Sequence, residues 1–505
     1  MLEKFEQEVW KKIPHLEKSN NTTIVNATPL RNITEDFKIC TKTVLNLNLD
    51  NKDLMIFGKF DSGLPTGSIK VRPALNIIHD AISKGKIRRG QTIFEATSGN
   101  FGIALGQLSK LGLDVVTLVS RKLQDGVFEE LRNEKTRIIN LDMDICPAPG
   151  MKESPNVLVA KATAGNIRSQ LSELGFDPVV FYSAISEVQT LLVSQDIINL
   201  AKLLAKIYRG FCPEQYDNEM NIEAHRTITA PEIDQQLHGI NQSLADFRIV
   251  CTFGTGGTSG GLSRYVSEKY GKKSLHVVFP VPGQDVAGIR TKDKASGLKF
   301  YEPERYEGQH EVDFKHARLM LKFFVDKGYD MGESSALALY AVAQIINSGE
   351  FGGKFVVIIA DGIQKYKKNL EETSKKQNPI EISLQEATSS IGDYDKIIWV
   401  HTQYTPREEG IEMIAKSLVV DKSKIIVPKA RDVERLLMNH QVPEVLKDLG
   451  SGKSLLVCMA GNTSLMAVRE LATKGITTQS LTGGISTLSQ GKVKHIGELI
   501  KVATE

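Results

Sequence analysis

With 505 residues the chain is too long for one core, which rarely serves more than about 300 residues, so two or three domains are expected. Its 63 basic and 60 acidic side chains leave a formal net charge of +3, too small for a chain that wraps nucleic acid. With 41% hydrophobic and 24% charged residues, the composition is that of an ordinary globular protein, and no apolar run is long enough to span a bilayer.

The cysteines and the first residues indicate the compartment. The cysteines are odd in number, widely spaced and never arranged as C-x-x-C, so neither a disulfide framework nor a cysteine metal site is expected. The opening "MLEKFEQEVWKKIPHLEK" has no apolar core of signal-peptide length. The sequence therefore indicates a cytoplasmic protein. The cysteines are Cys40, Cys146, Cys212, Cys251 and Cys458.

Short β-branched runs alternate with helical patterns from about residue 55 to 365. This alternation predicts an α/β fold whose parallel strands are covered by helices on both faces. Within the inserted span 150–212, the apolar spacing of residues 186–208 predicts one long packing helix, with a lid or partner surface as the alternative. Strands are expected at 54–60, 91–97, 114–120, 136–142, 247–253, 274–280 and 354–360, and helices at 102–112 and 335–349.

A polar, lysine-rich stretch at 369–383 ends in Asn-Pro and predicts a linker. A second, smaller α/β alternation follows it. We therefore expect a first domain at 1–375, a linker at 376–384 and a second domain at 385–505. In the second domain, strands are expected at 396–402, 423–428, 453–461 and 478–484, with a helix at 465–475.

The stretch "GLPTGSIKVRPA", residues 63–74, places one lysine in a tight turn at a helix start. Lys70 stands between Ile69 and Val71, whereas a lysine on a solvated helix usually has polar neighbours. One interpretation is a helix capped by Ser68 with Lys70 in its first turn. The other is a desolvated amine that forms a Schiff base.

Two further motifs place small polar residues between a strand and a helix. "FEATSGNFGIALG", residues 94–106, offers backbone N–H groups and hydroxyls that can bind a carboxylate, although it fits a simple capped helix as well. "CTFGTGGTSGGLSRYV", residues 251–266, lets the backbone approach an anion closely. It fits neither the Walker pattern nor a dinucleotide fingerprint, so a phosphorylated cofactor is the better interpretation.

Five blocks in this order carry a resemblance. "NATPL" at 26–30, "PTGSIKVRPA", "EATSGNFGIALG", "EQYDNEMNIEAHRTITAPEI" at 214–233 and "GTGGTSGG" are similar to blocks of fold type II pyridoxal-phosphate enzymes. Residues 25–370 most closely resemble the cysteine synthase and cystathionine β-synthase branch. The resemblance implies the tryptophan synthase β-like fold, with two open α/β subdomains, and pyridoxal 5′-phosphate as the cofactor.

The resemblance also implies residue roles. Lys70 is the lysine of the internal aldimine, and Asn100 bonds the phenolate oxygen of the cofactor. The substrate carboxylate is held by Thr97, Ser98, Gly99 and Gln215, and the 5′-phosphate by Gly254, Thr255, Gly256, Gly257 and Thr258.

Three departures from the family pattern concern substrate and cofactor contacts. Phe101 stands where a second threonine is usual, which removes one carboxylate donor and predicts a more apolar pocket. Gly362 stands where a serine usually bonds the pyridine nitrogen, so Asp361, a water or nothing serves that atom. Residues 283–301 lack the usual glycine-rich closing motif, which leaves the substrate open.

The implied reaction is β-replacement. An activated serine-type amino acid loses its β-substituent, and a nucleophile adds to the resulting α-aminoacrylate to give cysteine or a related amino acid. The reverse alternative is a β-lyase that cleaves a cysteine-like substrate. We expect a homodimer that binds a small amino acid and a sulfur donor or acceptor, with a sulfur-carrier protein as a further partner and no nucleic acid or membrane.

Residues 455–486 resemble the active loop of rhodanese-like domains. A strand, Cys458, a short loop with Gly461 and Ser464, a helix and a strand ending in "GG" follow one another. Amides around the sulfur and a helix start favour a thiolate that can carry a persulfide. Thr463 replaces a frequent arginine and residues 396–410 lack Asp-x-Arg, so an inactive copy or a docking module is the alternative, and a buried structural thiol is the simplest one. The other four cysteines are expected in core or loop positions.

Overall fold

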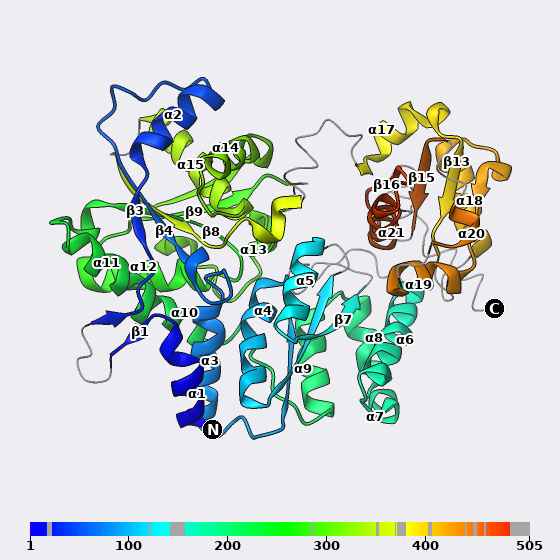
Figure 1. The fold of residues 1–505 in the computed structure, drawn as a ribbon, viewed down its shortest axis with the longest axis horizontal. Coiled ribbons are helices and arrows are strands. Elements are labelled where there is room, and N and C mark those ends of the chain that lie inside the picture. The colour runs from blue at the N-terminus through cyan, green and yellow to red at the C-terminus, as the bar shows by residue number, and fades with distance from the viewer. Residues whose placement is uncertain are drawn as a thin grey trace.

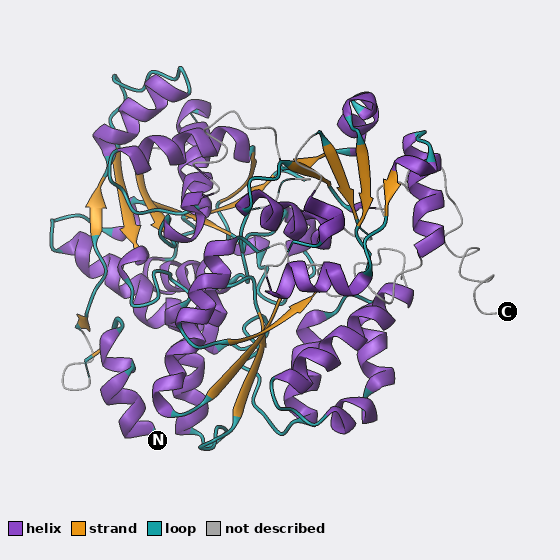
Figure 2. Ribbon diagram, turned by 45° about the vertical axis from the view of Figure 1, so that its right-hand side comes forward, coloured by secondary structure: helices purple, strands orange, loops and turns teal. Residues whose placement is uncertain are grey.

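The computed structural model describes residues 1–17, 23–120, 123–141, 157–282, 284, 286–349, 353–368, 370, 380–401, 407–439, 442–447, 452–458 and 461–484. Within these residues, three sheets of three to six strands are each flanked by helices (Figures 1 and 2). A short antiparallel pair, β1 (His15–Leu16) and β2 (Ile24–Val25), lies near the N-terminus. The predicted α/β class is confirmed.

The largest sheet has the strand order β10-β9-β8-β11-β4-β3. All neighbours are parallel except β3, which runs antiparallel to β4. Four of these strands were predicted; the two edge strands are short or polar and were not. The strands are β3 (Leu30–Asn32), β4 (Met55–Phe60), β8 (Arg248–Thr252), β9 (Leu275–Pro280), β10 (Gly308–Val312) and β11 (Lys354–Ile359).

Both faces of this sheet are buried, which explains its continuous apolar strands. Along β11, Phe355 and Val357 enter one core while Val356 and Ile358 enter another, as the alternation of a strand requires. The first core includes α2 (Thr34–Val44), α14 (Phe314–Asp326) and α15 (Glu333–Ser348); the second includes α11 (Ala230–His238) and α12 (Gly257–Tyr270).

A second, three-stranded parallel sheet has the order β5-β6-β7. Its strands are β5 (Thr92–Ala96), β6 (Asp114–Ser120) and β7 (Arg137–Leu141). One face packs on α1 (Leu2–Glu8), α3 (Val71–Ser83) and α4 (Asn100–Gly106), and the other on α6 (Val157–Glu173) and its neighbours. The helix α3 therefore leads from one sheet to the other, and Lys70 stands at its start.

The prediction of one long helix over 186–208 is wrong. The segment forms α8 (Ile185–Val193) and α9 (Ile197–Ile207). Between them Gln195 has a φ of 55°, and the side chain of Asp196 accepts a hydrogen bond from the N–H of Asn199. A left-handed residue followed by an aspartate cap ends one helix and starts the next.

The C-terminal part of the chain forms a third sheet, with five parallel strands in the order β12-β16-β15-β13-β14. The strands are β12 (Glu381–Ile382), β13 (Lys396–Trp399), β14 (Ile425–Ile426), β15 (Ser454–Val457) and β16 (Thr478–Leu481). Because β12 already pairs with β16, this sheet begins within the stretch 376–384 that was expected to be a linker.

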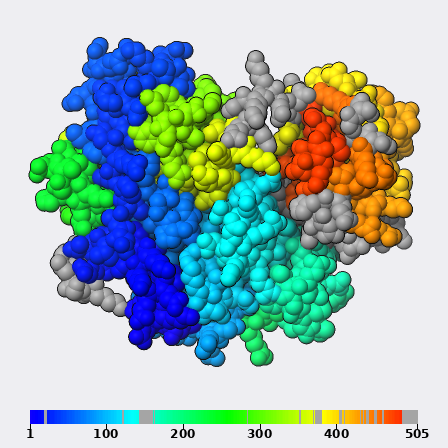
Figure 3. All heavy atoms as spheres, in the orientation of Figure 1, coloured from blue at the N-terminus to red at the C-terminus, as the bar shows by residue number. Residues whose placement is uncertain are grey.

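Helices cover the third sheet on both faces as well. One core contains residues of α17 (Leu384–Ser389) and α18 (Arg407–Leu418). The other contains residues of α19 (Ala430–Asn439), α20 (Glu444–Lys447) and α21 (Asn462–Thr473). The guanidinium of Arg469 on α21 donates to the carbonyl of Leu123 at 3.0 Å, and Figure 3 shows this unit against the cyan segment of the first.

A fully buried ionic network holds the start of α3. Lys59 and Arg72 supply two positive charges, and Asp61 and Glu232 supply two negative ones. Lys59 Nζ and Arg72 Nη1 each lie 2.6 Å from an oxygen of Glu232, and Arg72 Nη2 lies 2.7 Å from Asp61. Thr28 of the "NATPL" block donates from its hydroxyl to Asp61 at 2.6 Å. The network joins four separate segments directly beside the turn that contains Lys70.

No helix in the described parts of the chain is both long and apolar enough to cross a lipid bilayer.

Candidate active site

The turn that contains Lys70 meets the glycine-rich turn after β8. Ile69 and Val71 are buried, so the backbone on both sides of Lys70 is fixed by packing. Lys70 Nζ lies 3.8 Å from the position that a Cβ on Gly254 would occupy. Two motifs almost 200 residues apart in sequence thus place an amine directly beside the backbone of the glycine-rich turn.

The glycine-rich turn forms the N-terminus of α12. Gly256 has a φ of +89°, a conformation that a side chain disfavours, and α12 follows with 14 residues. The first N–H groups of a helix have no partner within the helix, so they and the helix dipole attract an anion. The turn therefore has the backbone geometry of an anion site, next to the amine of Lys70.

Asn221 connects this turn to the predicted substrate-binding loop. Its Nδ2 donates to Thr255 Oγ1 at 3.1 Å and to the carbonyl of Gln215 at 2.6 Å. A Cβ on Gly257 would collide with the amide of Asn221. Glycine is therefore required at residue 257 by close packing.

His225 holds Thr258, the last residue of the predicted phosphate loop. It begins a π-helical turn, His225–Thr229, which joins α10 (Met220–Ala224) to α11. Its Nε2 lies 3.3 Å from Thr258 Oγ1 and its Nδ1 lies 3.0 Å from Thr229 Oγ1. Burial, together with the nearby charges of Arg72 and Lys70, lowers the pKa of His225 well below its ordinary value. His225 is therefore neutral and orients the Thr258 hydroxyl.

The turn after β5 is organised by Thr97. Its buried hydroxyl oxygen accepts hydrogen bonds from the N–H groups of Gly99 at 3.1 Å and Gly102 at 3.3 Å. Ser98 is only half-buried, and its Oγ lies 3.1 Å from the Cβ position of Gly288. The carbonyl oxygen of Gly288 in turn lies 2.8 Å from the Cβ position of Gly254. Gly288 therefore connects Ser98 to Gly254, and Ser98 lies on the Lys70 side of the site.

Gln215 closes the same site from the other side. It is buried, and its Nε2 donates to the carbonyl of Ala96 at 2.9 Å. The described contacts thus connect Gln215 through Ala96 to the Thr97 turn and through Asn221 to Thr255.

Asn100, Asp361 and Tyr366 form a buried cluster at the end of β11. Asp361 Oδ2 accepts a hydrogen bond from Asn100 Nδ2 at 2.8 Å and from the Tyr366 hydroxyl at 2.6 Å. Asn100 Oδ1 and Asp361 Oδ1 are buried without a hydrogen-bond partner among the described residues. Burial raises the pKa of Asp361, which the neighbouring Lys365 opposes. The bridge between Ser68 and Asp361 ties this cluster to the Lys70 turn.

The structure bears on two sequence expectations about side chains in this site. A Cβ on Gly362 would lie 2.5 Å from Asp330 Oδ1, so a side chain at residue 362 would face Asp330, whereas the Asp361 carboxylate contacts Asn100. Phe101 does not make the pocket apolar, because it is 2% exposed and belongs to the core that contains α3.

Sequence motifs alone did not single out several residues of the site. His225 and Asn221 lie inside the block at 214–233, but their roles depend on contacts with the glycine-rich turn. Gly288 and Arg290 lie in the segment that departs from the family pattern; Arg290 is buried with its guanidinium 5.0 Å from the ring centre of Tyr216. The departure from the family pattern was the only sequence feature that pointed to these two residues.

Cys458 lies in the third sheet, and no described contact joins it to the Lys70 site. It follows β15, is 3% exposed, and its Sγ accepts a hydrogen bond from Ser464 Oγ at 3.3 Å. Of the other cysteines, Cys40 and Cys251 are buried free thiols whose pKa burial raises to about 12. Cys212 is a free, partly buried thiol, and Cys146 lies outside the described residues.

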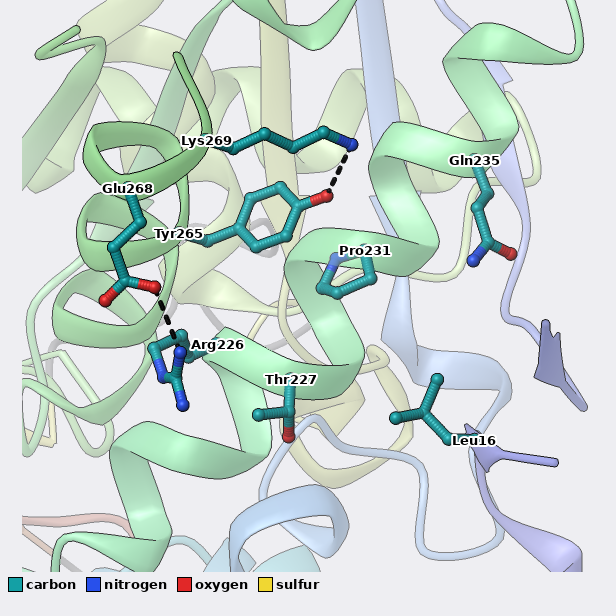
Figure 4. A pocket seen from close by; sticks show the side chains of 8 residues that line it. All are labelled: Leu16, Arg226, Thr227, Pro231, Gln235, Tyr265, Glu268 and Lys269. Atoms are coloured by element: carbon teal, nitrogen blue, oxygen red, sulfur yellow. Dashed lines mark hydrogen bonds and ion pairs between the residues drawn. The ribbon is translucent and has the colours of Figure 1, made fainter. Parts of the chain in front are cut away.

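A hollow of about 490 Å³ lies elsewhere on the first unit, between α11 and α12 (Figure 4). Its charged side chains are already paired: Arg226 with Glu223 and Glu268, and Lys269 with Asp234. This hollow leaves no charge for a ligand and shares no residue with the Lys70 site.

We expect Gly257→Ala to destabilise the protein by roughly 1–3 kcal/mol, because the added methyl group must displace Asn221 from its two hydrogen bonds. Urea unfolding gives the free energy. Gly63→Ala is the matched control, since nothing lies within 4 Å of its Cβ position. Equal effects of the two substitutions would contradict the proposed close contact.

Glu95 makes the free energy of unfolding of the protein depend on pH. Its fully buried carboxylate accepts from the N–H groups of Ala96 at 3.0 Å and Gln215 at 3.4 Å. Burial raises the pKa of Glu95 from 4.5 to about 8, and the Glu214 carboxylate acts in the same direction. Between these values the folded protein keeps a proton that the unfolded chain releases, so stability falls as pH rises, by up to about 1.4 kcal/mol per pH unit.

We therefore expect the stability difference between Glu95→Gln and the native chain to change progressively from about pH 5 to 8, since the amide cannot titrate. Urea unfolding across this range measures it. Glu129→Gln, an exposed position on the neighbouring helix α5 (Asp125–Asn133), should leave the native slope unchanged. Parallel curves for Glu95→Gln and the native chain would refute the assignment.

Curated proteins with similar sequences align with about three fifths of this chain. "Cysteine synthase B" of Pseudomonas aeruginosa is 27% identical over 310 residues, which cover 61% of this chain and 86% of that protein. The "O-acetylserine dependent cystathionine beta-synthase" of Bacillus subtilis is 24% identical over 333 residues, which cover 63% of this chain and 92% of that protein. Both alignments span most of the relative.

A solved structure shows the same fold at lower sequence similarity. O-ureido-L-serine synthase, in a variant bound to O-ureido-L-serine, superimposes with a TM-score of 0.51 at 19% identity and covers 70% of this chain and 92% of its own. The sequence profile described as "Pyridoxal-phosphate dependent enzyme" matches residues 41–362, more than half of the chain, which include the turns of Lys70, Thr97 and Gly254. The chain therefore belongs to the family of pyridoxal-phosphate dependent enzymes.

Proposed function

We propose that the first unit, residues 1–375, catalyses β-replacement on an activated serine-type amino acid and forms cysteine or a related β-substituted amino acid. The observation that carries this proposal is the convergence of three turns: Lys70 Nζ lies 3.8 Å from the Cβ position of Gly254, and Gly288 lies against both that position and the hydroxyl of Ser98. The similarity to cysteine synthases supports the same reaction class.

Each part of the site has a proposed role. The bound pyridoxal phosphate supplies an electron sink for the carbon from which a proton is removed. Lys70 holds the cofactor and, once released, takes and returns that proton at Nζ. Residues 254–258 hold the phosphate, with Thr258 oriented by His225.

The Asn100 and Asp361 pair faces the cofactor ring in this proposal. Tyr366 and Asn100 both donate to Asp361 Oδ2, and Asp361 Oδ1 and Asn100 Oδ1 have no hydrogen-bond partner among the described residues. Asp361, and not Gly362, is the residue that we propose for the pyridine nitrogen.

The substrate carboxylate is bound between two loops. We propose the hydroxyl of Ser98, the N–H groups of the Thr97–Gly99 turn and the amide of Gln215 as its donors. The anchoring of Gln215 to Ala96 and Asn221 supports this, because both loops are then fixed relative to each other before substrate binds.

Two assays separate synthesis from the reverse β-lyase reaction. The full-length protein is incubated with O-acetylserine and sulfide, or with cysteine alone. We expect amino-acid product in the first assay. Sulfide release from cysteine, without product in the first assay, would instead establish the β-lyase alternative.

We further propose that the second unit, from β12 onwards, handles sulfane sulfur through Cys458. Supporting this, Cys458 ends an inner strand of a parallel sheet and precedes the start of α21, and Ser464 donates to its sulfur. A sulfur atom bound there would be passed to the first unit or to a sulfur-carrier protein.

We expect Cys458→Ser to lower cysteine formation from O-acetylserine, thiosulfate and dithiothreitol by more than about tenfold, while the reaction with free sulfide is unchanged. Thiosulfate transfers its outer sulfur to the Cys458 thiolate and leaves as sulfite, and the dithiol reduces the resulting persulfide to sulfide, whereas free sulfide needs no carrier thiol. Product is quantified by chromatography. Cys212→Ser, at the partly buried free cysteine of the first unit, is the control. If Cys458→Ser retains full activity with thiosulfate, the second unit serves as a docking module.

A further inference from the structure

One surface hollow of the first unit carries an uncompensated positive charge. It measures about 620 Å³, and five of its ten lining residues are cationic. Lys86, Arg88 and Arg89 lie in the loop between α3 and β5, and Lys206 and Arg209 lie at the end of α9. No acidic residue lines it, and no described side chain forms an ion pair with any of these five.

This hollow differs from the other charged hollows of the first unit. In the hollow of Figure 4, Arg226 and Lys269 are paired with carboxylates. In a third one, lined by Arg248 and Lys354, Arg248 pairs with Glu307 at 3.1 Å. Unpaired cations around a concave surface repel one another and concentrate anions from solution.

The two cationic segments are held together by Gln91. Its Nε2 donates to the carbonyls of Arg209 at 2.9 Å and Gly210 at 3.1 Å, and its Oε1 accepts from the N–H of Arg88 at 3.0 Å. The backbone bridge between Ile93 and Phe211 fixes the same junction. The arrangement of the cations is therefore set by the fold.

The helix dipole explains only part of this cluster. A cation such as Lys206 in the last turn of α9 is favoured by the carbonyl end of the helix. Arg88 and Arg89 lie beyond the end of α3, which is Ser83, and no such effect places them beside Arg209.

We propose that this hollow is a binding site for a small oligophosphate, two or three linked phosphate groups. Guanidinium groups bind phosphate oxygens in pairs, and the volume suits a small ligand. No aromatic side chain is among the described residues that line the hollow, so these offer a nucleobase nothing to stack on. The phosphate chain, whether free or part of a nucleotide, is the recognised group.

The site lies away from the reaction centre. It occupies the end of α3 opposite Lys70, and the 13 residues of that helix separate the two by roughly 20 Å. In Figure 1 the loop from α3 to β5 runs along the lower edge of the molecule, at the start of β5, whereas the Thr97 turn follows the end of that strand.

Calorimetric titration of the full-length, cofactor-loaded protein with inorganic triphosphate tests the proposal. Arg88→Gln/Arg89→Gln/Arg209→Gln should raise the Kd at least about tenfold and leave basal turnover unchanged. Arg132→Gln/Lys135→Gln/Lys161→Gln removes the same charge at exposed positions elsewhere and should leave the Kd unchanged.

ATP should bind with an affinity close to that of triphosphate, because the base makes no contact. Absence of triphosphate binding to the native protein, or equal losses in both triple variants, would overturn the proposal. So would binding of a single-stranded oligonucleotide that strengthens with its length while triphosphate fails to compete, since that result would assign the surface to nucleic acid.

Discussion

Lys70→Ala should yield a folded protein that borohydride no longer joins covalently to pyridoxal phosphate, and whose turnover falls by at least roughly 10²- to 10⁴-fold from the lost proton transfer alone. Lys70 Nζ lies 3.8 Å from the Cβ position of Gly254, in the turn that we propose for the cofactor phosphate. In the native protein, peptide mapping after reduction should find the cofactor on the peptide that contains Lys70.

Lys365 makes this test discriminating, because it is a buried lysine near the site. Burial lowers the pKa of Lys365, and its Nζ donates to the carbonyl of Gly67 at 3.4 Å. It faces Asp361 and not the glycine-rich turn. Lys365→Ala should therefore keep the covalent link. Mapping of the reduced cofactor to Lys365 would refute the assignment of Lys70.

Much of this site could be predicted from the sequence because its parts are local. Lys70, Ser98 and Gly256 lie in turns of a few residues between a strand and a helix, where residue type and spacing define the backbone that can be offered to a ligand. The structure brings these three turns together as their order in the chain suggested.

The residues that support those turns could not be predicted in the same way. His225 reaches Thr258 and Asn221 reaches Thr255 across more than 30 residues, from a helix whose pattern reads as ordinary packing. The sequence also could not show whether residue 361 or residue 362 faces the site. Successive residues of an extended chain point to opposite sides, so the answer depends on which way the chain turns after β11.

The helix break at residue 195 shows a different limit. The apolar spacing continues from α8 into α9, so periodicity alone predicts one helix over 186–208. The signal against it was Ser194 to Asp196, a polar stretch with a residue type that caps helices. The two-residue strand β12 was too short to show any period at all.

The second large effect concerns the buried network beneath Lys70. Arg72→Met should destabilise the protein by about 3–5 kcal/mol, because it leaves Asp61 and Glu232 buried with only Lys59 to balance them. Urea unfolding measures the loss. Asp50→Asn, which breaks the half-exposed pair of Lys42 and Asp50, should cost less than about 1 kcal/mol.

Adding Asp61→Asn to Arg72→Met restores the balance of charge, so the double variant should be more stable than the sum of the two single effects predicts. The network also affects the site, since Arg72 fixes α3 two residues after Lys70 and Asp61 stands at the end of β4. The double variant should therefore regain stability more completely than it regains the yield of borohydride-trapped cofactor, because the ion pair that anchors the start of α3 to the end of β4 is absent from it. If the two single losses simply add, the four charges do not act as one unit, and the position of Lys70 depends on packing by Ile69 and Val71 alone.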